Sequence, residues 1–394
     1  MMELPKSSKS TGSAMLPADA RPLVGIRVLD FSTLLPGPLA TLMLAEAGAE
    51  VLKIERPGGG DELRGYSPKL GADSANFALL NRGKRSLEIN LKAPGAIARL
   101  QPLIASADVV VEQFRPGVMD RLGLGYAEMK TFNPGLIYCS IVGFASDGPA
   151  ANVAGHDMNY QAQTGLLALS ARGGGAPLIS PPLIADIGGG SYPAIINILM
   201  ALLRRANTGA GCRIEIAMAN CLYPFLYWAL ADGFATGKWP KPDSTMLTGG
   251  SCRYSIWRTA DGRYLSAAPI EDRFWREFCE TIGLDDALRD DTRDSSATRC
   301  AISERIASRT AVQWQNAFAN KDACVALVAT LEEAVSSPLF AKLFARRKTF
   351  RDGQSIPALP LPLAPEFLGP DEAYSPGLGD ANADYLTEIR HDIG

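Results

Sequence analysis

The chain has 394 residues, of which 47% are hydrophobic and 21% are charged, and its formal net charge at pH 7 is -3. This composition is typical of a globular protein, and the length favours two domains over one. A slightly acidic chain without a basic patch excludes non-specific nucleic-acid binding as its main function. The longest apolar stretch, 193–203, is too short to span a bilayer, so we expect no membrane segment.

Alternating strand and helix patterns organise residues 22–237. Apolar runs at 24–31 and 50–55 flank a helical pattern at 39–47, and this order is a parallel βαβ unit. Further strands are expected at 87–91, 108–112, 137–142 and 212–218, with helices at 94–106 and 192–205. We therefore expect an α/β large domain with a Rossmann-like, doubly wound parallel sheet. The first turn lacks a Gly-x-Gly-x-x-Gly run, so NAD binding is not supported.

The flanking segments predict the remaining organisation. Residues 1–21 lack a long apolar core, which indicates a disordered tail and no secretory signal. The Pro- and Gly-containing stretch 238–250 indicates a linker. A hairpin signal and charged amphipathic helices predict a small α+β domain at 251–334. Clustered prolines then indicate that 335–394 runs back, partly extended, over the large domain.

The cysteines and histidines bear on compartment and metal binding. Seven cysteines are scattered without a Cys-x-x-Cys pair, which predicts reduced, buried thiols in a cytoplasmic protein. With two histidines and no clustered acidic motif, we expect no metal site.

A group of cations stands at one turn of the large domain, in Asn81-Arg82-Gly83-Lys84-Arg85-Ser86. A solvated turn is the simpler interpretation. The alternative is a site for a phosphate-bearing ligand, because Arg and Lys at strand ends suit phosphate and because Arg56 and Lys92 flank the region.

Three side chains are candidates for proton transfer. His156, within Gly155-His156-Asp157-Met158-Asn159-Tyr160, is the one histidine outside the C-terminal tail, and histidine is the natural proton carrier near neutral pH. Asp186 precedes three glycines and a helical pattern, which places it in a loop leading to a helix N-terminus. Glu271 follows the apolar run 264–268. Structural roles remain open at this stage, since a lone histidine often satisfies a core and an aspartate before glycines often caps a helix.

Taken in order, several motifs resemble the family III CoA transferases and, within them, the α-methylacyl-CoA racemase branch. The resemblance rests on Leu35-Pro36-Gly37-Pro38, Glu55-Arg56-Pro57, 81–86 and Phe114-Arg115-Pro116-Gly117-Val118. Asp186 matches the aspartate that the family shares, and His156 is similar to the racemase branch. The chain departs from racemases at 268–271 and at 249–253. The second departure bears on the acyl pocket and leaves the acyl chain open.

The resemblance implies an isomerase that moves the α-proton of a 2-methyl-branched acyl-CoA through an enolate. His156 and Asp186 would act on opposite faces, with Glu271 orienting His156. Asp186 must then be protonated in one state, which favours a raised pKa. The backbone N–H groups of Gly188, Gly189 and Gly190 are candidate donors to the enolate oxygen.

Further implications concern binding and assembly. The family resemblance implies an interlocked homodimer, in which Glu271 reaches His156 across an interface, and acyl-CoA as substrate without a separate cofactor. Contacts with CoA are implied for Arg56, Ile89, Asn90, Leu91, Lys92, Arg115, Gly155, Asp157, Met158, Asn159 and Tyr160.

Two other functions stay open. In a CoA transferase, Asp186 would attack acyl-CoA and form a mixed anhydride. His156 argues against this role, since a transferase needs no second base at that position. A non-catalytic acyl-CoA-binding protein is the third possibility, and the presence of both His156 and Asp186 counts against it.

Overall fold

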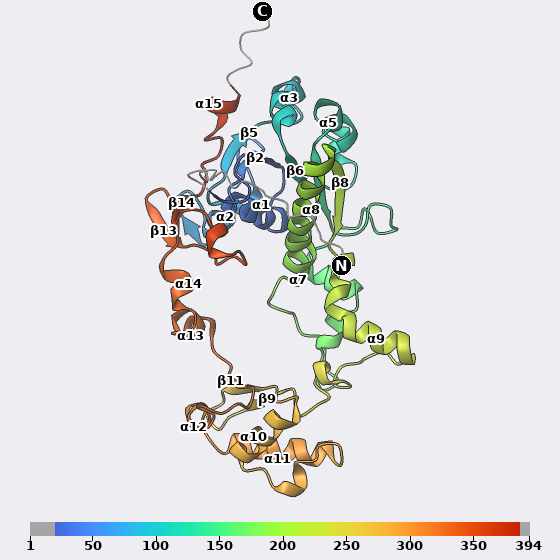
Figure 1. Ribbon diagram of the computed structural model, residues 1–394, viewed down its shortest axis with the longest axis vertical. Helices are drawn as coiled ribbons and strands as arrows, with labels where there is room; N and C mark the ends of the chain where they lie inside the picture. Colours follow the sequence, from blue (N-terminus) through green and yellow to red (C-terminus); the bar gives the residue numbers. More distant parts are fainter. Residues whose placement is uncertain (1–19, 387–394) are drawn as a thin grey trace, which may run out of the picture. The chain divides into compact units, whose positions relative to one another are not determined.

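The computed structural model describes residues 20–386 (Figure 1). Most of the expected N-terminal tail, 1–21, and the end of the expected C-terminal segment, with His391, lie outside these residues. The described chain divides into two compact units. Unit 1 contains 20–141, 194–215 and 347–386, and unit 2 contains 142–193 and 216–346. The structure thus groups 142–193 with the expected small domain, a division that differs from the sequence-based domain bounds.

A six-stranded sheet in the order β5-β2-β1-β6-β7-β8 forms the centre of unit 1. Its strands are β1 (Arg27–Asp30), β2 (Glu50–Glu55), β5 (Arg85–Glu88), β6 (Val109–Glu112), β7 (Ile137–Val142) and β8 (Cys212–Ala217). The pairings of β1, β2, β5, β6 and β7 are parallel. Hydrogen bonds from Cys212 to Leu136 and from Met218 to Val142 extend the parallel arrangement to β8. The expected α/β fold with a parallel sheet is confirmed.

Counted along the chain, these six strands lie in the order 3-2-1-4-5-6, the arrangement of doubly wound nucleotide-binding sheets. Its switch point lies between β1 and β6, where ligands of such folds bind outside the carboxyl ends of the strands. A nucleotide can therefore bind at this edge of the sheet although the Gly-rich fingerprint is absent. That absence argues only against binding of a dinucleotide such as NAD.

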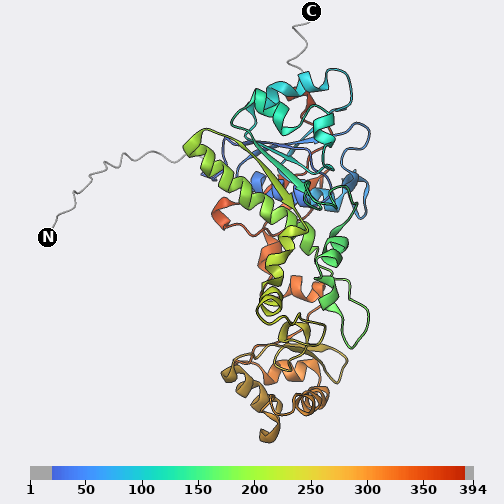
Figure 2. The ribbon, with the colours of Figure 1, turned by 90° about the vertical axis from the view of Figure 1, so that its right-hand side faces the viewer.

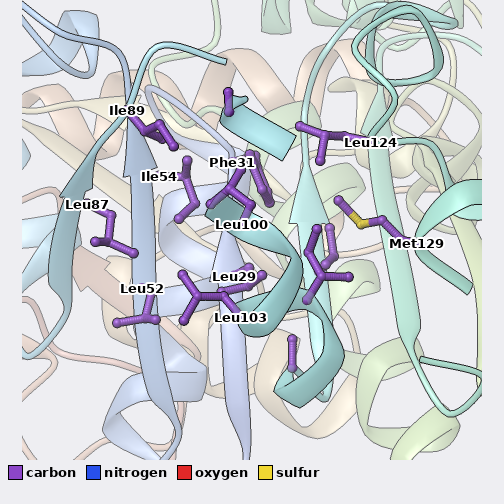
Figure 3. Close-up of a cluster of buried hydrophobic side chains, with 14 of the residues drawn as sticks. Leu29, Phe31, Leu52, Ile54, Leu87, Ile89, Leu100, Leu103, Leu124 and Met129 are labelled. Carbon is purple, nitrogen blue, oxygen red and sulfur yellow. The ribbon is translucent and has the colours of Figure 1, made fainter. Parts of the chain in front are cut away.

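Helices cover both faces of the sheet (Figures 1 and 2). Leu100 and Leu103 of α3 (Ala96–Ser106) lie over Leu29 and Leu52 on one face (Figure 3). On the other face, the Thr41 hydroxyl of α1 (Pro36–Glu46) donates to Asp30 at 2.5 Å. The remaining helices of unit 1 are α2 (Ala75–Asn81), α4 (Val118–Arg121), α5 (Tyr126–Phe132), α8 (Tyr192–Thr208), α15 (Asn382–Tyr385), and the 3₁₀ turns η1 (Glu62–Gly65) and η7 (Pro365–Phe367).

The cations at 81–86 have internal partners. Arg82 lies beside Glu46, Lys84 binds Asp30, and both cationic side chains are buried. Arg85 pairs with Asp384 of the C-terminal segment. Arg82 and Lys84 therefore form neither a solvated turn nor a phosphate site, because they are buried and paired with carboxylates of the same unit, whereas Arg85 is 40% exposed.

The C-terminal segment is attached to unit 1 by hydrogen bonds. Gly83 donates its N–H to Tyr374 at 2.8 Å, and Ala381 donates to Ser86 at 2.9 Å. The segment forms the small sheet β13-β12-β14, with β12 (Lys348–Arg351), β13 (Gln354–Pro357) and β14 (Glu372–Tyr374). A two-stranded sheet of β3 (Lys69–Leu70) and β4 (Asp73–Ser74) completes the unit.

Unit 2 has its own core, in which Trp275 and Phe278 of α10 (Asp272–Ile282) pack with Trp314. The expected hairpin is present, since β9 (Ser255–Arg258) pairs with β10 (Tyr264–Ala267) in antiparallel register. The other elements are α6 (Asp157–Gln163), η2 (Leu167–Ser170), α7 (Ile184–Asp186), η3 (Ile187–Ser191), η4 (Asn220–Leu226), α9 (Tyr227–Thr236), η5 (Met246–Thr248), η6 (Asp286–Leu288), α11 (Ser295–Ala307), α12 (Ala311–Ala317), β11 (Val325–Leu327), α13 (Leu331–Ser336) and α14 (Ala341–Ala345).

One helix among the described residues, Ile184–Thr208, is long and apolar enough to cross a membrane. The apolar stretch is longer than expected because 184–191 is helical. Ala194, Ile198 and Ala201 of this helix are buried in the protein. A single partly buried helix of this kind is weak evidence for a membrane span.

All seven cysteines are free thiols. Cys139, Cys252 and Cys279 are buried as expected, whereas Cys300 and Cys324 are exposed. The expectation that all thiols are buried is therefore wrong for Cys300 and Cys324.

Candidate active site

His156 is the residue that precedes helix α6. Its backbone N–H donates to Asn159 Oδ1 at 3.0 Å, and its backbone oxygen accepts the N–H of Asn159 at 2.8 Å. An amide side chain three positions after the cap position satisfies a donor that the helix start leaves unpaired. The spacing from His156 to Asn159 thus fixes the histidine backbone at a helix N-terminus, while the imidazole remains exposed.

Tyr160 fixes the irregular segment that leads to His156. Its hydroxyl donates to the Gly155 carbonyl at 2.7 Å, and its ring lies edge-on to Phe144 at a centroid distance of 5.3 Å. A Cβ atom at Gly155 would lie 2.9 Å from the Tyr160 ring. Glycine at this position therefore permits the close approach that fixes the entrance to α6.

Asp186 lies in a helix and not in a loop, so the sequence-based loop is wrong. It ends α7, and the glycines continue the helix as the π-turn η3, which leads directly into α8. A Cβ at Gly188 would lie 2.8 Å from the Phe225 ring, and one at Gly189 would lie 2.6 Å from the Met218 carbonyl oxygen. The glycines are thus explained by close packing on a helix turn, and π-turns often occur at functional sites.

The Asp157 carboxylate connects the histidine segment to the aspartate helix. Its Oδ1 accepts the backbone N–H groups of Ala185 and Asp186, at 2.6 and 3.0 Å. Its Oδ2 accepts from Gln161 Nε2 at 2.5 Å. Asp157 is only 4% exposed. Both oxygens of this buried carboxylate are hydrogen-bonded within the protein. The CoA contact implied for Asp157 stays a prediction, and the backbone of Asp157 would have to make it.

The pKa of Asp186 is raised to about 6, first by burial and second by the neighbouring Asp157 carboxylate. The positive form of His156 acts in the opposite direction and favours ionised Asp186. The pKa of the Tyr160 hydroxyl is also raised, by burial and by the charges of Asp186 and Asp157. An Asp186 carboxyl with a pKa near 6 can both donate and accept a proton close to neutral pH.

The first N–H groups of the Asp186 helix already have acceptors. Pro182 and Leu183 carbonyls accept two of them, and Asp157 accepts the two between. The glycine amides lie beyond this first turn, in the part of a helix where N–H groups bond within the helix. A role as enolate-oxygen donors stays a prediction for Gly188, Gly189 and Gly190.

Glu271 is the exposed residue that precedes helix α10. Within residues 20–386, no hydrogen bond or ion pair joins its side chain to His156. Arg253 binds the residues on both sides of Glu271: Arg253 Nη1 donates to the Ile270 carbonyl at 3.2 Å and to Asp272 Oδ1 at 2.7 Å. The predicted role of Glu271 in orienting His156 is therefore not supplied by any described contact and stays a prediction.

A cavity of about 870 Å³ lies in unit 1 at the carboxyl ends of β1, β2, β5 and β6. It is lined by five of the residues implied to contact CoA: Arg56, Ile89, Asn90, Leu91 and Lys92. Arg56 is partly engaged, by the Gly60 carbonyl at 3.0 Å and by Glu62 at 3.0 Å. The position matches the ligand site of doubly wound sheets at the switch point.

Sequence reasoning missed several residues of this cavity. Phe31, Thr33, Phe114 and Arg121 also line it. Arg115, which was implied to contact CoA, is exposed and does not line the cavity, whereas its neighbour Phe114 does. The available signal was position, since Phe31 and Thr33 follow β1 and the loop at Phe114 follows β6, the two strands that flank the switch point.

The chain matches the model of CoA-transferase family III over residues 23–380. It belongs to CoA-transferase family III. Within residues 20–386, no group of three or more His, Cys, Asp or Glu side chains is arranged to hold a metal ion.

Relatives in this family carry two kinds of name. The chain is 32% identical over 372 residues to α-methylacyl-CoA racemase of Mus musculus, covering 93% of each chain. It is 31% identical over 341 residues to acetyl-CoA:oxalate CoA-transferase of Acetobacter aceti, covering 84% of this chain and 86% of that one. The crystal structure of Rv3272 from M. tuberculosis has the same fold, with a TM-score of 0.80 and 29% identity, and the match covers 93% of this chain and all of that one. A family III enzyme acting on acyl-CoA is therefore shown, and the racemase and transferase branches are almost equally similar.

Proposed function

We propose that this protein racemises the α-carbon of 2-methyl-branched acyl-CoA thioesters by moving a proton between its two faces. One observation carries this proposal: Asp186, with a pKa raised to about 6, lies close enough to His156 for the two charges to interact. A nucleophilic carboxylate needs only to be ionised. A group that must both give and take a proton works best with a pKa near the working pH, and histidine already meets this condition.

The α-carbon of a thioester is weakly acidic, so one residue must remove its proton and another must return one. His156 takes the proton from one enantiomer, and the C–H electron pair becomes the C=C bond of an enolate whose oxygen carries the negative charge. Protonated Asp186 then donates to the opposite face, which inverts the configuration. In the reverse direction the two residues exchange roles, as microscopic reversibility requires.

We propose that the nucleotide part of CoA binds in the cavity at the carboxyl ends of the strands. Among the described residues, no ion pair engages Lys92 or Arg121 at this cavity. Its three acidic lining residues are neutralised: Glu55 by Arg64 at 2.7 Å, Asp61 by Lys53 at 2.9 Å, and Glu62 by Arg56 at 3.0 Å. Cations without internal partners in a cavity suit the phosphates of CoA.

The resemblance also supports a homodimer, working in the cytoplasm, in which Glu271 of a second copy orients His156. Helix α8 presents a row of apolar side chains to solvent: Tyr192, Ile196, Leu199, Met200 and Leu203. Such a row on one helix face is suited to burial against another chain. The exposed position of Glu271 also leaves its carboxylate accessible to a second copy.

The second candidate function is CoA transfer with Asp186 as nucleophile. The similarity to acetyl-CoA:oxalate CoA-transferase favours it. In that reaction the Asp186 carboxylate attacks the thioester carbonyl, CoA leaves as its thiolate, and an acyl anhydride forms at Asp186. The scheme gives no task to His156.

Incubation of the protein with a 2-methylacyl-CoA in deuterated buffer, without any carboxylic acid, tests the proposal. We expect deuterium at the α-carbon and loss of optical purity at similar rates. A parallel reaction contains oxalate, succinate or glutarate as acceptor, and we expect no CoA transfer to any of them. Absence of exchange together with CoA transfer would establish the second candidate and exclude the first.

A further inference from the structure

One buried carboxylate belongs to the residue next to one proposed proton carrier and is hydrogen-bonded to the backbone of the other. Asp157 follows His156 in the chain, so the two share a peptide bond. Its side chain reaches across to α7 and accepts the N–H of Asp186 itself, at 3.0 Å, and that of Ala185, at 2.6 Å. The sequence separation between these partners is 29 and 28 residues, so no local constraint would otherwise hold them together.

Gln161 fixes the second oxygen of the same carboxylate. Its Nε2 donates to Asp157 Oδ2 at 2.5 Å from one turn further along α6. Both oxygens are therefore committed, and the side chain is almost completely buried. A carboxylate that accepts two N–H groups at a helix N-terminus also interacts favourably with the helix dipole.

We infer that Asp157 is a positioning residue, which sets the spacing of His156 and Asp186 and keeps a fixed negative charge beside the Asp186 carboxyl. This inference rests on the proposed function for its catalytic meaning, although the bonds themselves do not depend on it. The helix dipole and the fixed charge act in opposite directions on Asp186. The dipole favours its ionised form, and Asp157 favours its protonated form.

The other titratable groups near Asp186 are few. They are His156, which precedes α6, and Tyr160 on α6. The η4 turn that packs on α7 carries Cys221 and Tyr223, and it has neither a carboxylate nor a cation. Asp157 is therefore the one carboxylate among these elements that raises the pKa of Asp186.

Two variants separate the hydrogen bonds from the charge. In Asp157→Asn, the amide oxygen still accepts from Ala185 and Asp186, but the negative charge is lost. In Asp157→Ala, both are lost. Asp294→Asn is the matched control, because Asp294 also caps a helix of unit 2 through one backbone N–H, at 2.9 Å, and lies outside the proposed site.

Hydrogen–deuterium exchange of the backbone gives a readout that is independent of the reaction. We expect the amides of Ala185 and Asp186 to exchange at least about tenfold faster in Asp157→Ala, and to stay protected in Asp157→Asn. Unchanged protection in Asp157→Ala would overturn the positioning inference, whatever the protein catalyses.

The pH profile of α-proton exchange gives the second readout. In Asp157→Asn we expect the limb of kcat/KM that reports Asp186 to move to lower pH. In Asp157→Ala we expect kcat to fall by about a hundredfold, since misplacement by about 1 Å has that effect. A purely structural cap would lower thermal stability in Asp157→Ala and leave the pH profile unmoved in both variants, which would overturn the inference. If the wild-type protein shows no exchange, the proposed function fails while the amide measurement still decides the role of Asp157.

Discussion

The buried carboxylates of unit 1 and those around Asp186 in unit 2 have opposite neighbours. In unit 1, Asp30 faces Lys84 and Lys53, and these cations lower its pKa to about 2 even though burial acts to raise it. In unit 2, Asp186 faces Asp157, and both burial and this like charge raise its pKa to about 6. Both carboxylates are removed from water to a large extent, so the sign of the neighbouring charge decides the outcome.

This difference separates structural from chemical carboxylates. The unit 1 network of Asp30, Lys53, Asp61 and Lys84 is fully buried or nearly so, and every member has an opposite charge or a hydrogen-bond partner. Such groups hold chain segments together. A carboxyl placed beside another carboxylate is costly for folding, and its persistence is a physical reason to assign it a function.

The largest effect expected on activity comes from His156→Ala. Loss of one proton carrier should lower racemisation by about a thousandfold, in the range typical of general acid–base groups. The cavity at the strand ends is untouched, so affinity for free CoA measured by calorimetry should change by less than about twofold. Full racemase activity in this variant would show that His156 and Asp186 are not the pair that transfers the proton.

The largest effect expected on stability comes from Lys53→Met in unit 1. This change leaves the buried Asp61 carboxylate without its partner at 2.9 Å, and breaking a buried pair costs about 3–5 kcal/mol. Urea denaturation measures the free energy of unfolding. The control is Arg85→Met, which removes the partly exposed pair with Asp384 and should cost less than about 1 kcal/mol. Equal losses in the two variants would contradict the structural role of the buried network.

Asparagine substitutions at Asp30 and Asp186 should change stability in opposite directions. The lowered pKa of Asp30 gives stability that is present above pH 3.8 and is lost as the pH falls towards about 2. Asp30→Asn should therefore cost at least about 2 kcal/mol at pH 7. The raised pKa of Asp186 is a penalty that is absent below pH 3.8 and grows as the pH rises through about 6.

Asp186→Asn should accordingly be more stable than the wild type at pH 8, by about 1–2 kcal/mol after allowing for its partial exposure. At pH 3.5 the two proteins should have the same stability. Thermal or urea unfolding between pH 3.5 and pH 8 measures both variants. If Asp186→Asn is less stable than the wild type at pH 8, the ionised Asp186 carboxylate does not cost stability, and the contrast with Asp30 of unit 1 is lost.

The smallest expected effect concerns the cations of the cavity. Lys92→Gln and Arg121→Gln should each weaken CoA binding about two- to fivefold, and salt should reduce the difference, because both side chains are exposed. Lys130→Gln, an exposed lysine on α5 that does not line the cavity, is the control. Equal effects of all three changes would indicate general charge attraction and no site at the switch point.

Sequence patterns predicted the parallel sheet and the hairpin of unit 2 because alternating and β-branched runs depend on neighbours in the chain. They failed at 184–191, since three glycines suggest a loop. The helix there depends on distant partners: Asp157 receives its first N–H groups, and the ring of Phe225 packs against Gly188. No local pattern contains that information.

The same limit explains the cations at 81–86. Their residue types suit phosphate, but Glu46 and Asp384 neutralise two of them from positions far away in the sequence. Conversely, the cavity residues at Phe31 and Phe114 carry no chemical signal in the sequence. Only the strand order, with β1 beside β6, brings their loops together.

The most direct test of the account follows one pure enantiomer of a 2-methylacyl-CoA through a single turnover in deuterated buffer. The product enantiomer is separated, and its α-carbon is examined for deuterium. The reaction is quenched with hydroxylamine, and the mass of the peptide containing Asp186 is measured by mass spectrometry. We predict inverted product that carries deuterium and an unmodified Asp186 peptide. Retained protium at the α-carbon, together with a hydroxamate at Asp186, would contradict proton transfer and establish Asp186 as the nucleophile of a CoA transferase.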